Sequence, residues 1–339
     1  MLLLTNGNIE KAIDKIKPPR GAVDEVILLA IFSRNVYFEN VELPGNACMV
    51  KKRLLVPFAT LTLFLTSCQN PTLPVQEQPS YLHILPSWSK DGKTIAFIGT
   101  YNGVAGIYLV DSSGGAIHLL HAGNPTGCAW SPDSKQVVYS ENYNLYTVDV
   151  SNDTVHTLTS LGEDMYPAWS PDGNSIAFSR QSLGIYQYNL ATDTAVSVFQ
   201  LGDFPSWHPN GELVALAALG GGDAGIVYAF YARDVDSLHW RTLLTFLSPD
   251  YCTYPSVSPA GTTEKEIVFS LVPYAGYTEL WKIDIASGNV TQMTDDGGDY
   301  PSWSPDGSKM VYTRTQAGDG GLWIMNADGS GKHRLTSPS

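Results

Sequence analysis

From residue 86 onward, the chain is built of short runs in which apolar and polar residues alternate, separated by turns rich in Pro, Asp, Gly, Asn and Ser. Alternation with a period of two predicts β-strands that bury one face. The clearest runs hold two large apolar residues two positions apart: Ile95/Phe97, Val137/Tyr139, Ile176/Phe178, Val214/Leu216, Ile267/Phe269 and Met310/Tyr312. Further runs end in Asp or Asn, as in residues 145–149 and 322–326. This part of the chain is therefore expected to consist of strands.

A seven-residue phrase with the consensus Pro-x-Trp-Ser-Pro-Asp-Gly precedes each of these paired runs. Its central residues are Trp88, Trp130, Trp169, Trp207, Val257 and Trp303. They are separated by 42, 39, 38, 50 and 46 residues. A period near forty residues with four strands per repeat is typical of β-propeller blades. We therefore predict an all-β, six-bladed β-propeller over residues 86–339, with four antiparallel strands in each blade.

The repeated phrase has an evident structural use. A tryptophan on the innermost strand fills the wedge between neighbouring blades, and truncating it should cost about 3–5 kcal/mol. Pro-Asp-Gly forms a tight turn, so the repeated aspartates are interpreted as turn residues. These aspartates are Asp91, Asp133, Asp172 and Asp306. Blade five has Val257 in place of the tryptophan, and we expect its packing against its neighbour to be the weakest.

The phrase, followed by Ile-Ala-Phe at 95–97 and Ile-Tyr-x-x-Asp at 107–111, resembles the TolB-type (WD40-like) propeller repeat. The resemblance covers roughly residues 86–339 and implies the fold. The TolB family also carries an α/β domain before its propeller. Fewer than twenty residues separate Cys68 from the first blade, so the resemblance does not extend to that domain. The Tol–Pal transport role is therefore not expected of this chain.

Residues 49–67 have the pattern of a bacterial lipoprotein signal peptide. Lys51-Lys52-Arg53 is basic, and the apolar stretch from Leu54 to Thr66 is too short for a comfortable membrane span. The sequence Leu65-Thr66-Ser67-Cys68 resembles the lipobox, in which the cysteine is lipidated and becomes the mature N-terminus. Lipidated Cys68 would anchor the protein on the extracytoplasmic side of a membrane, in the periplasm or at the cell surface. The alternative is an ordinary signal anchor with an incidental cysteine.

The remaining divisions of the chain follow from this interpretation. Residues 68–85 comprise the lipidated cysteine and a flexible tether. Because a lipoprotein signal should stand at the start of a protein, we interpret residues 1–48 as a mis-annotated extension upstream of a true start at Met49. A real cytoplasmic extension ahead of a membrane anchor is the alternative.

The charge of the chain excludes some partners. The formal net charge is −13, from 20 basic and 33 acidic residues. Residues 1–67 hold eight of the basic and six of the acidic residues. The rest of the chain therefore has 12 basic and 27 acidic residues and a net charge of −15. Such a surface repels nucleic acid and anionic lipid. Cys128 and Cys252 belong to opposite blades, so no disulfide between them is expected.

Motifs for catalysis are missing from the sequence. It contains no Gly-x-Ser-x-Gly elbow, and residues 220–225, which match Gly-x-Gly-x-x-Gly, join two strands and lead into no helix. The seven histidines are scattered without metal-ligand spacing, and His208 replaces a turn serine of the repeated phrase. We therefore name no catalytic, cofactor-binding or metal-binding residue. A divalent cation held in the central channel by several blades, as in propeller lyases and lactonases, stays open.

One group of residues directly before the repeated phrase stands apart from the turn aspartates. Three blades carry an acidic residue with an aromatic one, and blade five has a tyrosine in the same approach: Asp164/Tyr166, Asp203/Phe204, Asp299/Tyr300 and Tyr254. These residues enter the innermost strands and should surround one mouth of the channel. Their composition predicts an acidic, tyrosine-rich face suited to a protein or peptide. The alternative, that the aspartates only link the blades, is left open.

Two functions follow from these observations. The first is a membrane-anchored, non-catalytic module that binds an envelope protein or peptide or serves as an envelope scaffold. The second is a metal-assisted lyase or lactonase acting on carbohydrate or lactone. No organic cofactor is implied by either pattern.

Overall fold

The computed structural model describes residues 84–222, 225–233, 239–259, 266–273, 276–314 and 320–336. The predicted lipoprotein signal, Cys68 and residues 1–48 lie outside these residues. The described residues form six four-stranded sheets, and every strand pairs with its neighbours in antiparallel fashion. Within this part of the chain, no helix has the length and apolar character needed to cross a membrane. The predicted six-bladed, all-β propeller is confirmed.

Each sheet is made of four consecutive strands. Blades one to three comprise β1 (Ile84–Trp88), β2 (Thr94–Tyr101), β3 (Val104–Asp111), β4 (Ile117–Ala122), β5 (Pro125–Trp130), β6 (Gln136–Glu141), β7 (Asn144–Asp149), β8 (Val155–Thr157), β9 (Asp164–Trp169), β10 (Ser175–Arg180), β11 (Gly184–Asn189) and β12 (Thr194–Phe199). Blades four to six comprise β13 (Asp203–Trp207), β14 (Leu213–Gly222), β15 (Gly225–Arg233), β16 (Trp240–Ser248), β17 (Tyr251–Val257), β18 (Glu266–Val272), β19 (Glu279–Asp284), β20 (Val290–Gln292), β21 (Asp299–Trp303), β22 (Lys309–Arg314), β23 (Gly321–Asn326) and β24 (His333–Arg334).

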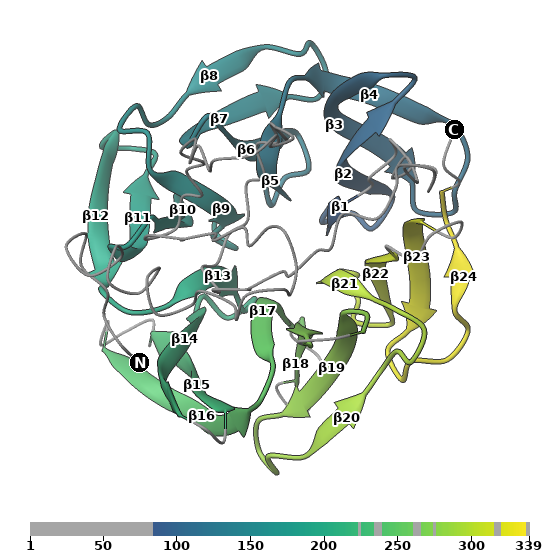
Figure 1. Ribbon diagram of the computed structural model, residues 1–339. Helices are drawn as coiled ribbons and strands as arrows, with labels where there is room; N and C mark the ends of the chain where they lie inside the picture. The colour runs from purple at the N-terminus through teal and green to yellow at the C-terminus, as the bar shows by residue number, and fades with distance from the viewer. Residues whose placement is uncertain are drawn as a thin grey trace, which may run out of the picture. The chain divides into compact units, whose positions relative to one another are not determined.

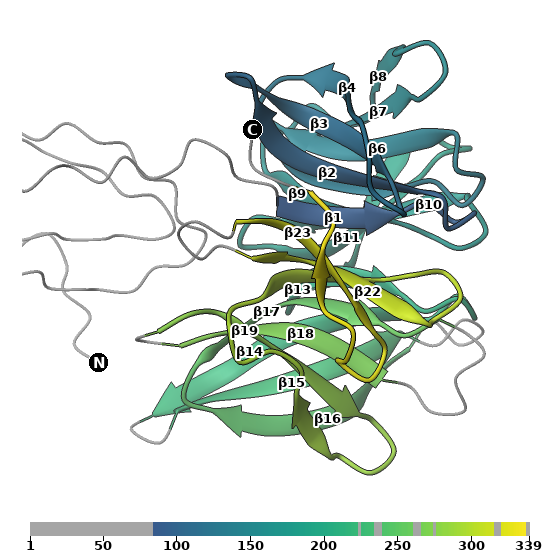
Figure 2. The ribbon, with the colours of Figure 1, turned by 90° about the vertical axis from the view of Figure 1, so that its right-hand side faces the viewer.

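The blades surround a central channel. Figure 1 looks along this channel, with the first strand of each blade innermost and the fourth strand outermost. Blade one lies next to blade six, and among the described strands the ring closes there without an exchange, because β24 pairs with β23 of its own blade. Figure 2 shows β1 running along the channel axis, so the two ends of an inner strand lie at opposite faces of the ring.

The hydrophobic core is divided into clusters that each join two neighbouring blades. Trp88 packs with Val311 and Leu322 of blade six, and Trp130 packs with Ala96 and Ile107 of blade one, in clusters of buried side chains. Trp303 joins blades five and six in the same way, while Trp169 and Trp207 are only half-buried. The predicted wedge role of the motif tryptophans is confirmed.

The cluster between blades four and five contains Val257. Three phenylalanine rings, Phe230, Phe246 and Phe269, belong to the same cluster, with their centroids 5.6 to 5.8 Å apart. They come from β15, β16 and β18. The expectation that this junction packs most weakly stays a prediction.

The Ser-Pro-Asp-Gly turns are held by the aspartate carboxylate. In blade two, the Ser131 hydroxyl and the Lys135 backbone N–H both donate to Asp133 Oδ1, at 2.7 and 3.1 Å. The same bonds recur around Asp91, Asp172 and Asp306. In blade four, His208 Nδ1 accepts a hydrogen bond from the Asn210 N–H at 3.3 Å. His208 is therefore a turn residue, as predicted.

Candidate functional site

Five inner strands carry a non-glycine residue with left-handed backbone directly before the motif proline. The φ angles of Leu85, Tyr166, Phe204, Tyr254 and Tyr300 lie between 51° and 55°. Each residue falls where the pairing of the first and second strands shifts register. Such backbone is rare for bulky residues and costs roughly 1–3 kcal/mol each. A bulge of this kind redirects a side chain, here into the channel.

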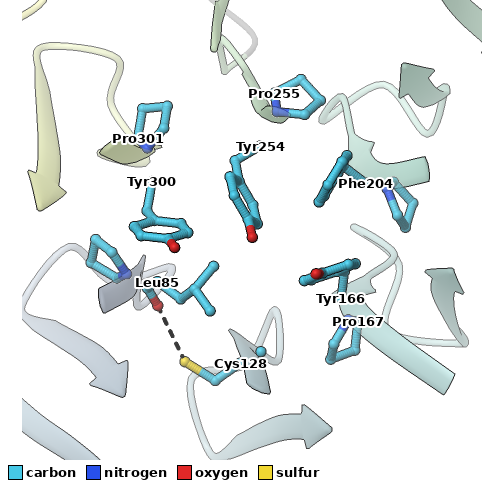
Figure 3. Close-up of a pocket in the computed structure, with 12 residues that line it drawn as sticks. Leu85, Cys128, Tyr166, Pro167, Phe204, Tyr254, Pro255, Tyr300 and Pro301 are labelled. Atoms are coloured by element: carbon cyan, nitrogen blue, oxygen red, sulfur yellow. Dashed lines mark hydrogen bonds between the residues drawn. The ribbon is translucent and has the colours of Figure 1, made fainter. Parts of the chain in front are cut away.

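Four of these side chains form an aromatic cluster inside the channel, shown in Figure 3. We call Tyr166, Phe204, Tyr254 and Tyr300 the channel aromatics. Tyr254 lies between the others, with its ring centroid 4.4 Å from Tyr300, 4.7 Å from Phe204 and 5.7 Å from Tyr166. Each such ring pair contributes about 0.5–1.5 kcal/mol beyond its buried area. The cluster is therefore a rigid set of rings and not a fringe of loose side chains.

A cavity of about 140 Å³ lies among the channel aromatics. Blades one and two contribute Leu85 and Gly127 at the positions where the other blades have rings. Cys128, also in the lining, donates a hydrogen bond from Sγ to the Leu85 carbonyl oxygen at 3.4 Å (Figure 3). Burial raises the pKa of the Cys128 thiol to about 12, so it stays protonated near neutral pH. A nucleophilic role for this cysteine is thus disfavoured.

Buried serines of neighbouring blades fix the backbone of two channel aromatics. The Ser179 hydroxyl of blade three accepts a hydrogen bond from the Phe204 N–H at 3.1 Å. Ser270 of blade five does the same for Tyr300, also at 3.1 Å. Sequence reasoning missed these serines, although each directly follows the phenylalanine of a paired apolar run. The positions of the rings therefore depend on contacts between blades.

Asp164 does not belong to a binding face. Its side chain has no exposed surface, and it accepts hydrogen bonds from Arg180 Nε at 2.6 Å and from Nη2 at 3.0 Å. It pairs with Arg180 on β10. Asp203 and Asp299 pair with Leu216 and Thr313. Counted from the residue that pairs with the motif tryptophan, these two residues stand one position earlier in their strands than Arg180 does in β10. A shift of one residue reverses the face of a strand. Grouping Asp164 with the other two aspartates was therefore wrong.

Asp203 and Asp299 directly precede Phe204 and Tyr300, and both are half-buried. Asp299 Oδ1 accepts a hydrogen bond from the Tyr300 N–H at 2.8 Å. Burial raises the pKa of Asp299 to about 6, and hydrogen bonds from Ser270 and the Tyr300 N–H oppose that change. The channel thus has an aromatic lining with these two carboxylates behind it, and not an exposed acidic rim.

Exposed leucines lie at the same end of the propeller, in blades two to four. Leu161, Leu183, Leu201 and Leu219 are 69, 46, 55 and 46% exposed. They lie in loops and strand ends of blades two to four, at the end where the inner strands begin. The Leu183 N–H, for example, donates to the carbonyl of Arg180, the residue paired with Asp164 at the start of β9. We call these four side chains the mouth leucines.

Asp299 gives a pH-dependent prediction. A carboxyl group with a higher pKa in the folded state favours folding when protonated, so its contribution is present below about pH 4 and lost as the pH rises through about 6. The Asp299→Asn variant should therefore gain about 1–2 kcal/mol over wild type between pH 4.5 and pH 7.5, allowing for partial exposure. Urea unfolding of both proteins at the two pH values measures this gain. A difference that does not change with pH would contradict the burial of the charge.

Within the described part of the chain, no group of three or more His, Cys, Asp or Glu side chains is arranged to hold a metal ion. Cys128 and Cys252 are both free thiols. The channel-bound cation of the alternative function stays a prediction.

Comparison with known proteins finds similarity to TolB-type propellers. Residues 72–236 match the family described as TolB beta propeller domain. The Tol-Pal system protein TolB of Francisella tularensis subsp. mediasiatica is 25% identical over 227 residues, covering 62% of this chain and 51% of that protein. An uncharacterized protein of Agrobacterium fabrum is 25% identical over 167 residues, covering 42% of this chain and 56% of that protein.

A solved structure of a TolB protein has a fold similar to that of this chain. The crystal structure of TolB from Acinetobacter baumannii superimposes with a TM-score of 0.60 at 24% identity, covering 70% of this chain and 62% of that one. The chain thus spans a little over half the length of these relatives. At this identity the structural likeness concerns the fold alone.

Proposed function

We propose that this chain, a TolB-like β-propeller, is a non-catalytic module that binds a protein or peptide at the channel mouth. One observation carries the proposal: four blades hold a bulky aromatic residue in costly backbone, and the four rings meet inside the channel. Rings that are already fixed lose little conformational entropy on binding. Buried aromatic side chains near the centre of an interface are typical anchors of binding energy.

The surroundings of the rings favour a macromolecular partner. The mouth leucines add exposed apolar surface at the same end of the channel, as interaction sites on soluble proteins commonly do. The cavity of about 140 Å³ is smaller than the roughly 300–1,000 Å³ of sites that enclose a small molecule. It is better suited to one side chain of a larger partner.

The cellular setting belongs to the same proposal. The predicted signal at residues 49–67 and the predicted lipid on Cys68 would place the propeller on the extracytoplasmic side of a membrane, in the periplasm or at the cell surface. A relative named as a Tol-Pal system protein supports an envelope location. We therefore propose an envelope protein or peptide as the partner, with the net charge of −13 disfavouring nucleic acid.

Capture of partners by the tagged full-length chain, expressed in its native cells, tests this function. Tyr254→Ala removes the central ring, and Leu201→Ala removes a mouth leucine. Val196→Ala is the matched control, because Val196 is 57% exposed on the outermost strand β12, against 55% for Leu201. Both mouth variants should weaken the captured interaction by about tenfold or more, which is about 1.4 kcal/mol. The control should bind like wild type.

The three variants distinguish binding at the channel mouth from binding elsewhere on the surface. A partner that Tyr254→Ala and Leu201→Ala retain at full affinity does not bind at the channel mouth. Loss of the partner in Val196→Ala alone would move the interface to the outer edge of blade three. Thermal melting of each variant checks that it is folded.

A further inference from the structure

A second and larger cavity lies at the opposite end of the inner strands, between blades three and four. Its volume is about 630 Å³, within the usual range of small-molecule sites. The turns that follow β9 and β13 form two of its walls, and the side chains of Gln187 and Arg233 also line it. These turns stand at the far end of β9 and β13 from Tyr166 and Phe204. The cavity is therefore separate from the channel mouth.

The internal repeat shows that Arg233 is an exception. In every blade, the central residue of the repeated phrase, such as Trp207, pairs with a residue on the second strand. That second-strand residue pairs in turn with one residue on the third strand. In the other five blades that residue is apolar or aromatic and buried: Val110, Val148, Tyr188, Ile283 and Met325. In blade four it is Arg233, opposite Leu213. A charged side chain thus stands at a position that the fold otherwise uses for its core.

The guanidinium of Arg233 reaches towards blade three. Its Nη1 donates a hydrogen bond to Gln187 Oε1 at 2.8 Å, across the junction of the two blades. Partial burial lowers the pKa of Arg233, which nevertheless keeps its charge at neutral pH. Arg233 is partly buried at this position. Proteins commonly depart from the pattern of their fold at binding sites.

Trp207 presents an apolar wall to the same cavity. It is only partly buried, whereas Trp88, Trp130 and Trp303 are at most 8% exposed. Its Nε1–H donates to the Ala168 carbonyl oxygen at 3.1 Å, so the indole nitrogen is engaged and ring carbons remain for a ligand. Pro171, Pro209 and Leu213 extend the apolar lining.

Oxygen acceptors complete the lining. Asp172 and Asn210 are exposed residues on the two turns, one from each blade. Asp172 carries a carboxylate whose pKa is lowered mainly by the hydrogen bond from the Ser170 hydroxyl, so it is ionised at neutral pH. The cavity therefore combines a guanidinium, a carboxylate, side-chain amides and a tryptophan face.

We propose that this cavity binds a sugar acid, a ring-shaped polyhydroxylated carboxylate. A guanidinium matches a ligand carboxylate in a two-bond fork geometry. Ligand hydroxyls donate to the Asp172 carboxylate, and the C–H face of a sugar ring packs against Trp207. A simple apolar carboxylate would meet Asp172 with no hydroxyl to offer. A neutral sugar accepts hydrogen bonds from Arg233 but has no negative charge to pair with the guanidinium. This site goes beyond the proposed binding at the channel mouth and does not depend on it.

Isothermal titration of the full chain with glucuronate, glucose and acetate tests the site. Glucuronate should bind about tenfold or more tightly than either of the other two, because only it offers both a carboxylate and a hydroxylated ring. Arg233→Met, which introduces the residue found at this position in blade six, should weaken glucuronate binding by about tenfold or more. Lys309→Met removes one exposed positive charge in blade six and should bind like wild type.

Further readouts separate loss of the site from loss of the fold. The melting temperature of Arg233→Met should equal or exceed that of wild type, because an apolar residue returns to a core position. Tyr254→Ala should bind glucuronate normally, since the channel mouth is separate. Equal binding of glucuronate and glucose by wild type, no measurable binding of glucuronate, or unchanged binding by Arg233→Met would each overturn the proposal.

Discussion

Replacing Asp164 with alanine is expected to lower the free energy of unfolding by about 3–5 kcal/mol, because a buried cation loses its counter-charge. The Arg180 side chain is 7% exposed and donates to both carboxylate oxygens of Asp164. This hydrogen-bonded carboxylate raises the pKa of Arg180, which therefore cannot escape the cost by losing its proton. The guanidinium also lies over the Tyr186 ring at 4.2 Å, which holds it in place.

Blade six provides a matched control for this variant. Arg314 occupies the position of Arg180 and lies over the Trp323 ring at 4.3 Å. Its carboxylate partner Asp296 is 43% exposed, with Nη2 3.3 Å from Oδ2. Asp296→Ala should therefore cost less than Asp164→Ala, because the Asp296 carboxylate is partly exposed and Arg314 Nη2 keeps its hydrogen bond to the Asp296 carbonyl oxygen at 3.0 Å. Urea unfolding followed by tryptophan fluorescence compares the two variants. The ion pair would not have the proposed structural role if Asp164→Ala stayed within about 1 kcal/mol of wild type.

Trp303→Ala is the second variant with a large expected effect, again about 3–5 kcal/mol. The ring is 7% exposed and packs with Val268 and Leu280 of blade five as well as with its own blade. Its Nε1–H donates to the Ser256 carbonyl oxygen at 3.2 Å, across the same junction. Removing the indole leaves a cavity and an unpaired carbonyl at once.

Trp207→Ala is the control for burial. Trp207 makes the equivalent hydrogen bond, to the Ala168 carbonyl oxygen at 3.1 Å, but it is only partly buried and lines the second cavity. Its truncation should cost about 1–2 kcal/mol less than that of Trp303, because less apolar surface is lost. Both are measured from the shift in urea midpoint at constant slope. Equal losses for the two variants would show that burial in the wedge does not determine the cost.

Most of the fold could be predicted from the sequence because the patterns that indicate it are local and repeated. The turn aspartates and the wedge tryptophans recur at fixed offsets, and each blade is closed by hydrogen bonds near in sequence. The contacts between neighbouring blades were not visible in the same way. Phe230 and Phe269 meet through the contact of two blades, which no single repeat contains.

The site was harder to predict for two physical reasons. The direction of Tyr254 depends on a left-handed backbone that bulky residues rarely adopt, and strand alternation does not indicate such a backbone. For Asp164, the spacing held the information: it stands three residues before its motif proline, whereas Asp203 and Asp299 stand two before theirs. This difference of one residue in spacing decides whether the aspartate forms a buried ion pair or lies beside the channel.

Site-specific photo-crosslinking in native cells tests binding at the channel mouth most directly. A photoreactive residue would replace Leu201 at the mouth, Val196 on the outer strand, or Asn174, an exposed residue on the opposite face. We expect one discrete protein adduct from position 201, lost when Tyr254→Ala is added, and none from positions 196 and 174. The same adduct from position 174 or 196, with none from 201, would contradict binding at the mouth.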